Sequence, residues 1–324
     1  MTDNVLGIDV SKDTLDAHLL GGEQGRHRRV SNDPAGLQAL LTWLQHQPET
    51  PAWVCCEATG TYHLACARAF HPAGFAVSVI NPACIKGYAQ SELSRAKTDR
   101  VDARLIARYA QQADLLPWQP ESPEIAELRA LQHRRDSLEK THTQESNRLH
   151  APELPESVQA SCRRLLAVIA QEQAEIEARI QALFAASPSL RTQRELLASI
   201  PGFGPHTATA VATVLLSRPF RRARQVAAYS GLTPRPRRSG TSVRKPDRIS
   251  RQGPSSLRKL LYWPAIVAIR VQSPQIMPLV TGLRARGKTK MQIICAVMRK
   301  LLHTAFGVLK SQRPFDPAYH LQET

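Results

Sequence analysis

Two aspartates, Asp99 and Asp102, lie three residues apart in segment 97–104, Lys-Thr-Asp-Arg-Val-Asp-Ala-Arg. Apolar residues at helical spacing predict that this segment begins a helix. A three-residue spacing places both carboxylates on one helix face, about one turn apart, where they repel each other unless a cation lies between them. The pair therefore either lies on a solvated helix face that also carries arginines, or forms one half of a metal site.

Two further carboxylates stand at the ends of predicted buried strands. Asp9 lies in the apolar run 5–10, and strand 52–56 leads into Glu57 and a glycine-containing turn. A lone carboxylate in a buried strand costs free energy unless it binds a cation or a hydrogen-bond donor. Ribonuclease-H-like nucleases and actin-like sugar kinases, which place phosphate near the turn, both begin in this way.

The first part of the chain alternates strands and helices. We expect strands at 5–10, 14–20, 52–56 and 75–80, and helices at 34–47, 64–73 and from Asp99 onward. Such alternation predicts an α/β domain over residues 1–118, with carboxylates gathered at the ends of its strands.

The middle of the chain is charged and helical. Helices at 125–150 and 158–186 carry apolar residues at spacings of three, four and seven, and two prolines separate them. This pattern predicts a coiled-coil region over residues 119–188. The two helices either pair within one chain or pair with a second copy, and the pattern does not decide between these.

The charge is distributed unevenly along the chain. Residues 191–324 contain 24 Lys and Arg against 4 Asp and Glu, a net charge of +20, whereas residues 1–190 have a net charge of −4. Such asymmetry is typical of a protein that binds a polyanion. We expect the basic half to bind nucleic acid and the acidic half to contribute metal-dependent catalysis.

Two segments of the basic half are candidates for nucleic-acid contact. An Ile-Pro-Gly-Phe-Gly turn precedes the small-residue helix 207–216, as in a helix-hairpin-helix, and Gly202 and Gly204 would let backbone N–H groups approach a phosphate. An ordinary helical corner is the alternative. Segment 231–245 is rich in Arg, Pro and hydroxyl residues, and we expect it to lack regular structure. Its candidate phosphate-binding residues are Arg235, Arg237, Arg238, Arg244 and Lys245.

Five motifs in order resemble those of a known family. They are Gly-Ile-Asp9-Val-Ser-Lys, Glu57-Ala-Thr-Gly-Thr-Tyr, segment 97–104, Ile-Pro-Gly-Phe-Gly, and Gly-Leu-Thr-Pro-Arg followed by Ser239-Gly-Thr-Ser-Val-Arg. Together they resemble the DEDD-type insertion-sequence transposases of the family numbered one hundred and ten, which also includes the Piv-type DNA invertases. The resemblance extends from residue 7 to about residue 315.

The resemblance implies a RuvC-like, ribonuclease-H-like N-terminal domain, a helical coiled coil, and a mostly α-helical transposase domain over residues 189–324 with the helix-hairpin-helix. It implies that an acidic tetrad binds Mg²⁺ and that Ser239 is the nucleophile. It also implies a homo-oligomer, a tetramer built from dimers, that recombines donor and target DNA under the guidance of a structured bridge RNA. The tetrad residues are Asp9, Glu57, Asp99 and Asp102. Thr241, where a serine is common, is a small departure.

The resemblance therefore implies an RNA-guided, Mg²⁺-dependent DNA recombinase that cuts and rejoins strands through a covalent phosphoserine intermediate. The alternatives are a RuvC-like junction nuclease that uses metal-activated water, a nucleic-acid-binding scaffold with a decayed tetrad, and an actin-like kinase. The intact acids argue against the scaffold, and the +20 half argues against the kinase.

The location of the protein follows from composition. No apolar run reaches membrane-spanning length, and the polar N-terminus carries no signal peptide, so we expect a cytoplasmic, nucleoid-associated protein without a membrane partner. The six cysteines form no Cys-x-x-Cys pair, so we expect neither a zinc site nor a disulfide framework.

Overall fold

The computed structural model describes residues 4–21, 25–93, 98–239 and 243–318, and within 236–246 it describes the backbone alone. The chain divides into two compact units, Met1–Pro120 and Glu121–Thr324. The predicted coiled-coil region belongs to the second unit. The finer division into three domains at residues 118 and 188 stays a prediction.

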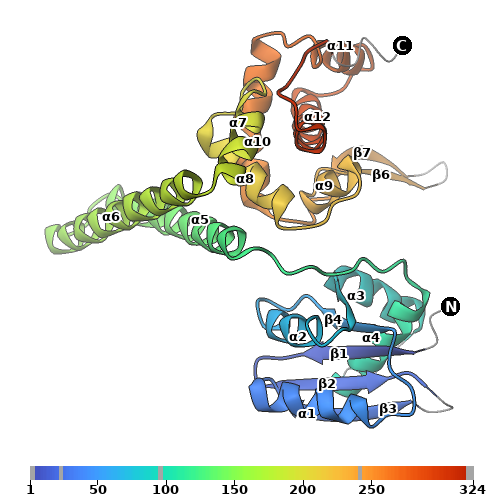
Figure 1. Ribbon diagram of the computed structural model, residues 1–324. Coiled ribbons are helices and arrows are strands. Elements are labelled where there is room, and N and C mark those ends of the chain that lie inside the picture. The colour runs from blue at the N-terminus through green and yellow to red at the C-terminus, as the bar shows by residue number, and fades with distance from the viewer. Residues whose placement is uncertain (1–3, 22–24, 94–97, 240–242, 319–324) are drawn as a thin grey trace. The chain divides into compact units, whose positions relative to one another are not determined.

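The first unit is built on a five-stranded mixed sheet with the strand order β3-β2-β1-β4-β5 (Figure 1). The strands are β1 (Val5–Val10), β2 (Thr14–Leu19), β3 (Arg26–Ser31), β4 (Trp53–Glu57) and β5 (Ala76–Ile80). The first three form an antiparallel meander, and β4 and β5 run parallel to β1. The four predicted strands are confirmed. The edge strand β3 was not predicted, because its Arg-His-Arg-Arg sequence lacks the apolar alternation of a half-buried strand.

Helices cover both faces of this sheet (Figure 1). Leu6, Ile8 and Val10 of β1 face α1 (Pro34–Gln45) and α2 (His63–Phe70), where they form one apolar core. The opposite face meets α4 (Asp99–Gln112), through which Ile106 and Ala110 join a second, smaller core. Helix α3 (Pro82–Ser91) precedes α4 and contacts it. The alternation of β1 therefore sends its even-numbered residues to one core and its odd-numbered residues, including Asp9, toward α4.

Gly7 allows β1 and α4 to pack closely against each other. A Cβ atom at Gly7 would lie 2.4 Å from the carbonyl oxygen of Ala103 and 2.4 Å from the backbone nitrogen of Ala107. Both atoms belong to the helix backbone, so neither can move without moving the helix. The helix can lie directly on the strand only because residue 7 has no side chain.

We expect Gly7→Ala to destabilise the protein by about 2 kcal/mol or more, since the added methyl group must push α4 away from the sheet. Urea or thermal unfolding measures this. Gly87→Ala is the matched control, because a Cβ at this position in α3 meets nothing within 4 Å. The control should be neutral or slightly stabilising, as alanine favours the helix. Equal stability of the two variants would contradict the tight packing of α4 on β1.

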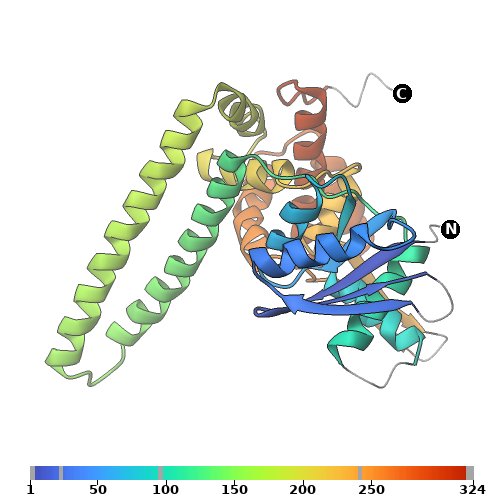
Figure 2. The ribbon, with the colours of Figure 1, turned by 60° about the horizontal axis from the view of Figure 1, so that its bottom comes forward.

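The second unit begins with a long helical hairpin. Helices α5 (Pro123–Leu149) and α6 (Glu156–Ala186) lie side by side in both views (Figures 1 and 2). Their apolar residues form a shared core that includes Leu128, Leu138, Ile169 and Ile180. The pairing shown is thus the one within a single chain.

The remaining helices surround α12 (Lys290–Ser311), whose apolar residues, among them Val297 and Leu301, lie at the centre of the largest core. By length and composition α12 is the one helix among the described residues that could cross a membrane. The predicted helix at 207–216 is confirmed. The helices around α12 are α7 (Pro188–Ala198), α8 (Pro205–Leu216), α9 (Ala223–Tyr229), α10 (Ser255–Arg270) and α11 (Met277–Ala285).

The expectation that segment 231–245 lacks regular structure was wrong. Strands β6 (Pro234–Ser239) and β7 (Val243–Ile249) form an antiparallel hairpin, which we call the serine hairpin. Its register shifts between Arg235 and Arg237, on either side of Pro236, so the proline lies where the ladder is already interrupted. Proline lacks the N–H that a regular ladder requires, and a bulge tolerates it.

Candidate active site

The sheet of the first unit gathers carboxylates on the face covered by α4. Asp9 of β1 pairs directly with Asp16 of β2, and directly paired residues project to the same face. Glu57 ends β4 and shares the face of Cys55, which pairs with Gly7 beneath α4. Three strands and the first turn of α4 therefore bring their acids to one region.

Asp9 is at the electrostatic centre of this acidic group. Burial raises the pKa of Asp9 from its ordinary value of 3.8 to about 6, with Asp102, Asp99, Glu57 and Asp16 adding smaller contributions in that order. The other three residues of the predicted tetrad thus all act electrostatically on Asp9. Such a group favours the binding of a cation, because a cation removes the repulsion that the folded chain otherwise maintains.

The acids approach one another without forming a closed cage. Within the described part of the chain, no three His, Cys, Asp or Glu side chains lie close enough together to hold a metal ion. Carboxylate oxygens are nevertheless the ligands that Mg²⁺ prefers, and Mg²⁺ commonly binds through one or two carboxylates together with waters and substrate phosphates. The donor set fits Mg²⁺, and a site of this kind would be completed by its substrate.

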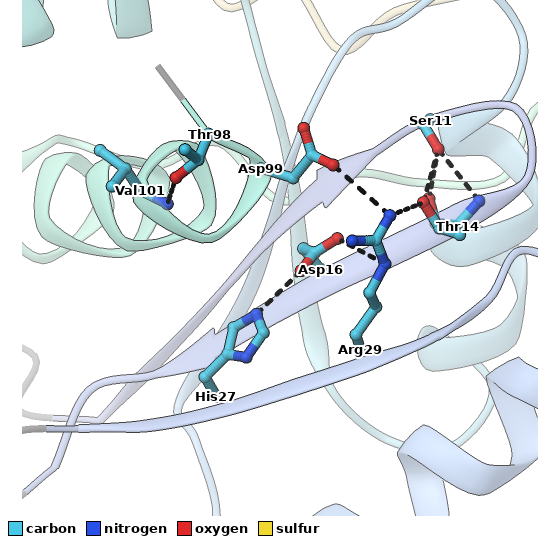
Figure 3. Close-up of polar contacts among 8 residues, drawn as sticks. All are labelled: Ser11, Thr14, Asp16, His27, Arg29, Thr98, Asp99 and Val101. Atoms are coloured by element: carbon cyan, nitrogen blue, oxygen red, sulfur yellow. Dashed lines mark hydrogen bonds and ion pairs between the residues drawn. The ribbon is translucent and has the colours of Figure 1, made fainter. Parts of the chain in front are cut away.

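The two helix acids lie at a favourable helix end. The hydroxyl of Thr98 accepts a hydrogen bond of 3.3 Å from the backbone N–H of Val101 and caps α4, as Figure 3 shows. Asp99 and Asp102 occupy the first turn of the helix. The positive end of the helix dipole lies there and offsets part of the repulsion between the two carboxylates.

A chain of charged contacts links Asp16 to Asp99 (Figure 3). Asp16 is 3% exposed, and its carboxylate oxygens lie 2.8 Å from Nε2 of His27 and 3.5 Å from Nε of Arg29. The same guanidinium group places Nη2 3.6 Å from Oδ2 of Asp99 and donates a 3.4 Å hydrogen bond to the hydroxyl of Thr14. Arg29 therefore stands between a buried acid and an exposed tetrad acid.

Sequence reasoning missed these three residues of the acidic region. Asp16, His27 and Arg29 all lie on β2 and β3, and β3 was not recognised as a strand. The usable signal was the alternation itself, since Asp16 precedes His18 by two residues and His27 precedes Arg29 by two. Polar residues at this period indicate one functional face of a strand rather than a loop.

The serine hairpin carries most of the predicted phosphate-binding residues. Its register pairs Arg237 with Lys245, Arg238 with Arg244, and Ser239 with Val243. The backbone thus gathers these residues at the tip, although their side chains lie outside the described part of the structure, as do residues 240–242 entirely. Arg235 is exposed near the base of the hairpin and pairs with Arg248.

The predicted helix-hairpin-helix glycines lie between α7 and α8. Gly202 has a φ of +88°, and a Cβ there would lie 2.9 Å from the carbonyl oxygen of Pro264 in α10, so packing alone requires a glycine. Gly204 is the exposed N-cap of α8, with open space around it. The structure therefore explains Gly202 without a ligand, and phosphate contact at this turn stays a prediction.

Comparison with known proteins identifies relatives over the whole chain. Residues 6–152 match a DEDD-type IS110 transposase family model, and residues 194–280 match the family described as "Transposase IS116/IS110/IS902 family". The pilin gene-inverting protein of Moraxella bovis is 32% identical over 99% of this chain and 100% of its own length. That of Moraxella lacunata is also 32% identical, again over 99% of this chain and all of the relative. An insertion element IS110 protein of Streptomyces coelicolor is 30% identical over 45% of this chain and 35% of its own length.

Proposed function

This chain belongs to the IS110 family of transposases and is a DNA recombination enzyme, and we propose that it is an RNA-guided, Mg²⁺-dependent recombinase acting through a phosphoserine intermediate. The observation that carries the proposal is the acidic group around Asp9, whose raised pKa reflects burial among four other carboxylates. The pilin gene-inverting relatives support recombination rather than simple cleavage. Recombination requires that every cut strand be rejoined.

The first unit is proposed to be a RuvC-like, ribonuclease-H-like domain. Its antiparallel β1–β3 meander continues into two strands parallel to β1, and a helix bearing acids covers the same sheet face as the strand acids. This arrangement supports the assignment. It also explains why an acid at the end of β1 and one at the end of β4 act together, since β1 and β4 are neighbours.

Asp9, Glu57, Asp99 and Asp102 are proposed to bind the catalytic cation. Bound Mg²⁺ would neutralise phosphate charge and stabilise the leaving oxygen. Asp9 supplies a carboxylate that is already partly desolvated, and the exposed Asp99 can turn toward either a cation or the guanidinium of Arg29. Arg29 holds the buried Asp16 at the same time and so limits the mobility of that edge of the acidic group.

Ser239 is proposed to supply the nucleophilic oxygen. Its hydroxyl oxygen attacks the scissile phosphorus and loses its proton to a base, while the bond from phosphorus to the departing deoxyribose oxygen breaks and that oxygen gains a proton. Attack by the hydroxyl of another strand reverses these steps and releases the serine. The phosphodiester bond energy is stored throughout, so rejoining needs no external energy source.

The acids and the serine belong to different compact units. The proposed reaction therefore requires both units to act on one phosphate within an assembly, which guards against stray cleavage. A homo-tetramer is the proposed assembly. Its support is the outer face of α6, where Leu165 and Val168 are 42% and 57% exposed although the helix pairs with α5.

The decisive experiment concerns RNA guidance. Protein purified with its associated RNA should recombine donor and target DNA, and treatment with ribonuclease should abolish sequence-specific recombination. Adding back the RNA transcribed from the protein's own genetic element should restore it, whereas an unrelated RNA of equal length should not. Sequencing of the copurified RNA would identify the guide. Full sequence specificity after complete removal of RNA would contradict the guided mechanism.

A further inference from the structure

The second unit contains a large cavity whose lining residues all belong to that unit. Its volume is about 1500 Å³, and residues of α10, α11, α12 and the base of the serine hairpin line it. Most binding sites for small molecules are smaller, at roughly 300–1,000 Å³. The cavity is open to solvent and mostly apolar, and it has room for more than one nucleotide.

The cavity presents an aromatic surface. Trp263 of α10 lines it and is 68% exposed, an unusual state for the residue with the largest apolar area. The ring of Tyr262 holds Trp263 in an edge-to-face contact, with centroids 5.7 Å apart and planes at 78°. Met291, which is 56% exposed, also lines the cavity. These side chains offer a flat, polarisable wall to a planar ligand.

The cavity is also strongly cationic. Asp247 is the one acidic residue among the described residues that line it, and Nζ of Lys288 lies 3.2 Å from a carboxylate oxygen of Asp247. Arg258 is engaged by backbone carbonyls, donating to those of Ser230 and Gly253. Six more cations line the cavity: Arg248, Arg251, Lys259, Arg286, Arg299 and Lys300. An anionic ligand with planar groups matches this combination of apolar wall and positive charge.

One wall residue has an unsatisfied polar atom. His303 lines the cavity, and its Nε2 atom is closed off from solvent and has no hydrogen-bond partner among the described residues. Burial, with Arg299 and Lys300 nearby, lowers the pKa of His303, so its ring is neutral at pH 7. The ring therefore adds little positive charge to the wall, and the positive charge of the cavity comes from its arginines and lysines.

We propose that this cavity binds an unpaired stretch of single-stranded nucleic acid, with a base stacked on Trp263 and the phosphates bound by the surrounding arginines and lysines. Aromatic platforms within basic grooves bind single strands in this way, because every base has a face that can stack. Bases within a duplex are already stacked on each other and cannot use the platform. The inference rests on the proposed function in one respect, because a recombinase must bind unpaired strands during strand exchange.

The position of the cavity links it to the serine hairpin. Pro234, Arg248 and Ile249, at the base of the hairpin, are part of its wall. Asp247 of β7 is tied to the start of α12 by Lys288 and by a 3.2 Å hydrogen bond from the side chain of Gln292 to its backbone carbonyl. A nucleotide bound here would lie at the base of the hairpin that carries Ser239, and so would help to place a strand relative to it.

The test compares binding of full-length wild-type and variant proteins to fluorescein-labelled oligouridylate and oligothymidylate of about twelve nucleotides, and to a duplex of the same length. Trp263→Ala should weaken single-strand binding roughly tenfold or more, while duplex binding changes by less than about twofold. Trp263→Phe should retain most of the affinity. Val271→Ala is the control, because Val271 caps the same helix and is 59% exposed but does not line the cavity.

The two single-stranded probes identify the source of the strand. Loss of oligouridylate binding alone assigns the site to RNA, loss of oligothymidylate binding alone assigns it to DNA, and loss of both assigns it to unpaired strands in general. Unchanged binding of both probes by a folded Trp263→Ala variant would overturn the inference. The readout is binding rather than recombination, so its failure would leave the proposed catalytic function untouched.

A second measurement does not depend on substitution. Oligonucleotides that contain 5-iodouracil form crosslinks to aromatic side chains when irradiated. Mass spectrometry of a tryptic digest should find the nucleotide on the peptide 260–270, which contains Trp263. Crosslinks found only on other peptides would show that the strand binds elsewhere.

Discussion

Ser239→Ala is expected to abolish both the covalent protein–DNA adduct and the recombinant product, a loss of at least about a thousandfold. With RNA, both DNA partners and Mg²⁺, the wild type should give a DNA species that survives denaturing electrophoresis and disappears on protease digestion. The variant should still bind RNA and DNA, because the hydroxyl contributes to bond formation rather than to the charge of the basic half. A water-using nuclease would leave free ends and form no adduct.

Ser242→Ala is the matched control for this experiment. Ser242 lies three residues away, in the same Ser-Gly-Thr-Ser segment, and it is the local competitor for the role of nucleophile. The Ser242→Ala variant should still form the covalent adduct and the recombinant product. Recombination by Ser239→Ala together with its loss in Ser242→Ala would move the nucleophile to residue 242. Cleavage without an adduct in the wild type would favour the junction nuclease.

The elements that position the acids were predictable from sequence because each carries a strong local signal. Asp9 interrupts an apolar run, and Asp99 and Asp102 begin a helix whose apolar residues repeat regularly. The sequence could not show the register that pairs Asp9 with Asp16, and it could not show the tight packing at Gly7. Both depend on contacts between segments far apart in the chain.

The errors have physical reasons of the same kind. Strand β3 is an edge strand, and its Arg29 and His27 contact a buried acid. Its composition is therefore cationic and resembles that of a loop. The serine hairpin is rich in proline and arginine, and a two-stranded ribbon has no apolar face to reveal it. The α5–α6 pattern shows which helix faces are apolar, but a pattern does not state which chain covers them.

Asp9→Asn is expected to abolish Mg²⁺-dependent strand exchange while making the metal-free protein more stable at neutral pH. The folded chain raises the pKa of Asp9 from 3.8 to about 6, so the ionised carboxylate is disfavoured by folding. Such a shift corresponds to at most about 3 kcal/mol, and partial exposure of the group reduces the effect to about 1 kcal/mol. Asparagine removes the charge and with it this penalty.

The pH dependence of stability shows in which direction Asp9→Asn should change the melting temperature, and a measurement at lower pH serves as the control. Because the folded pKa lies above the ordinary value, the favourable contribution of Asp9 is fully present below about pH 3.8 and is lost as the pH rises through about 6. In EDTA, the melting temperature of Asp9→Asn should therefore exceed that of the wild type at pH 7.5, and the difference should shrink at pH 5. Mg²⁺ at pH 7.5 should raise the melting temperature of the wild type more than that of the variant, since it binds the folded state through this carboxylate.

Asp16→Asn is the contrasting variant on the same sheet face: its carboxylate is paired with His27 and Arg29, so its loss should destabilise the protein by about 1–3 kcal/mol. If Asp9→Asn were destabilised in the same way, Asp9 would be a structural residue, and the acidic group around it would not be the catalytic centre.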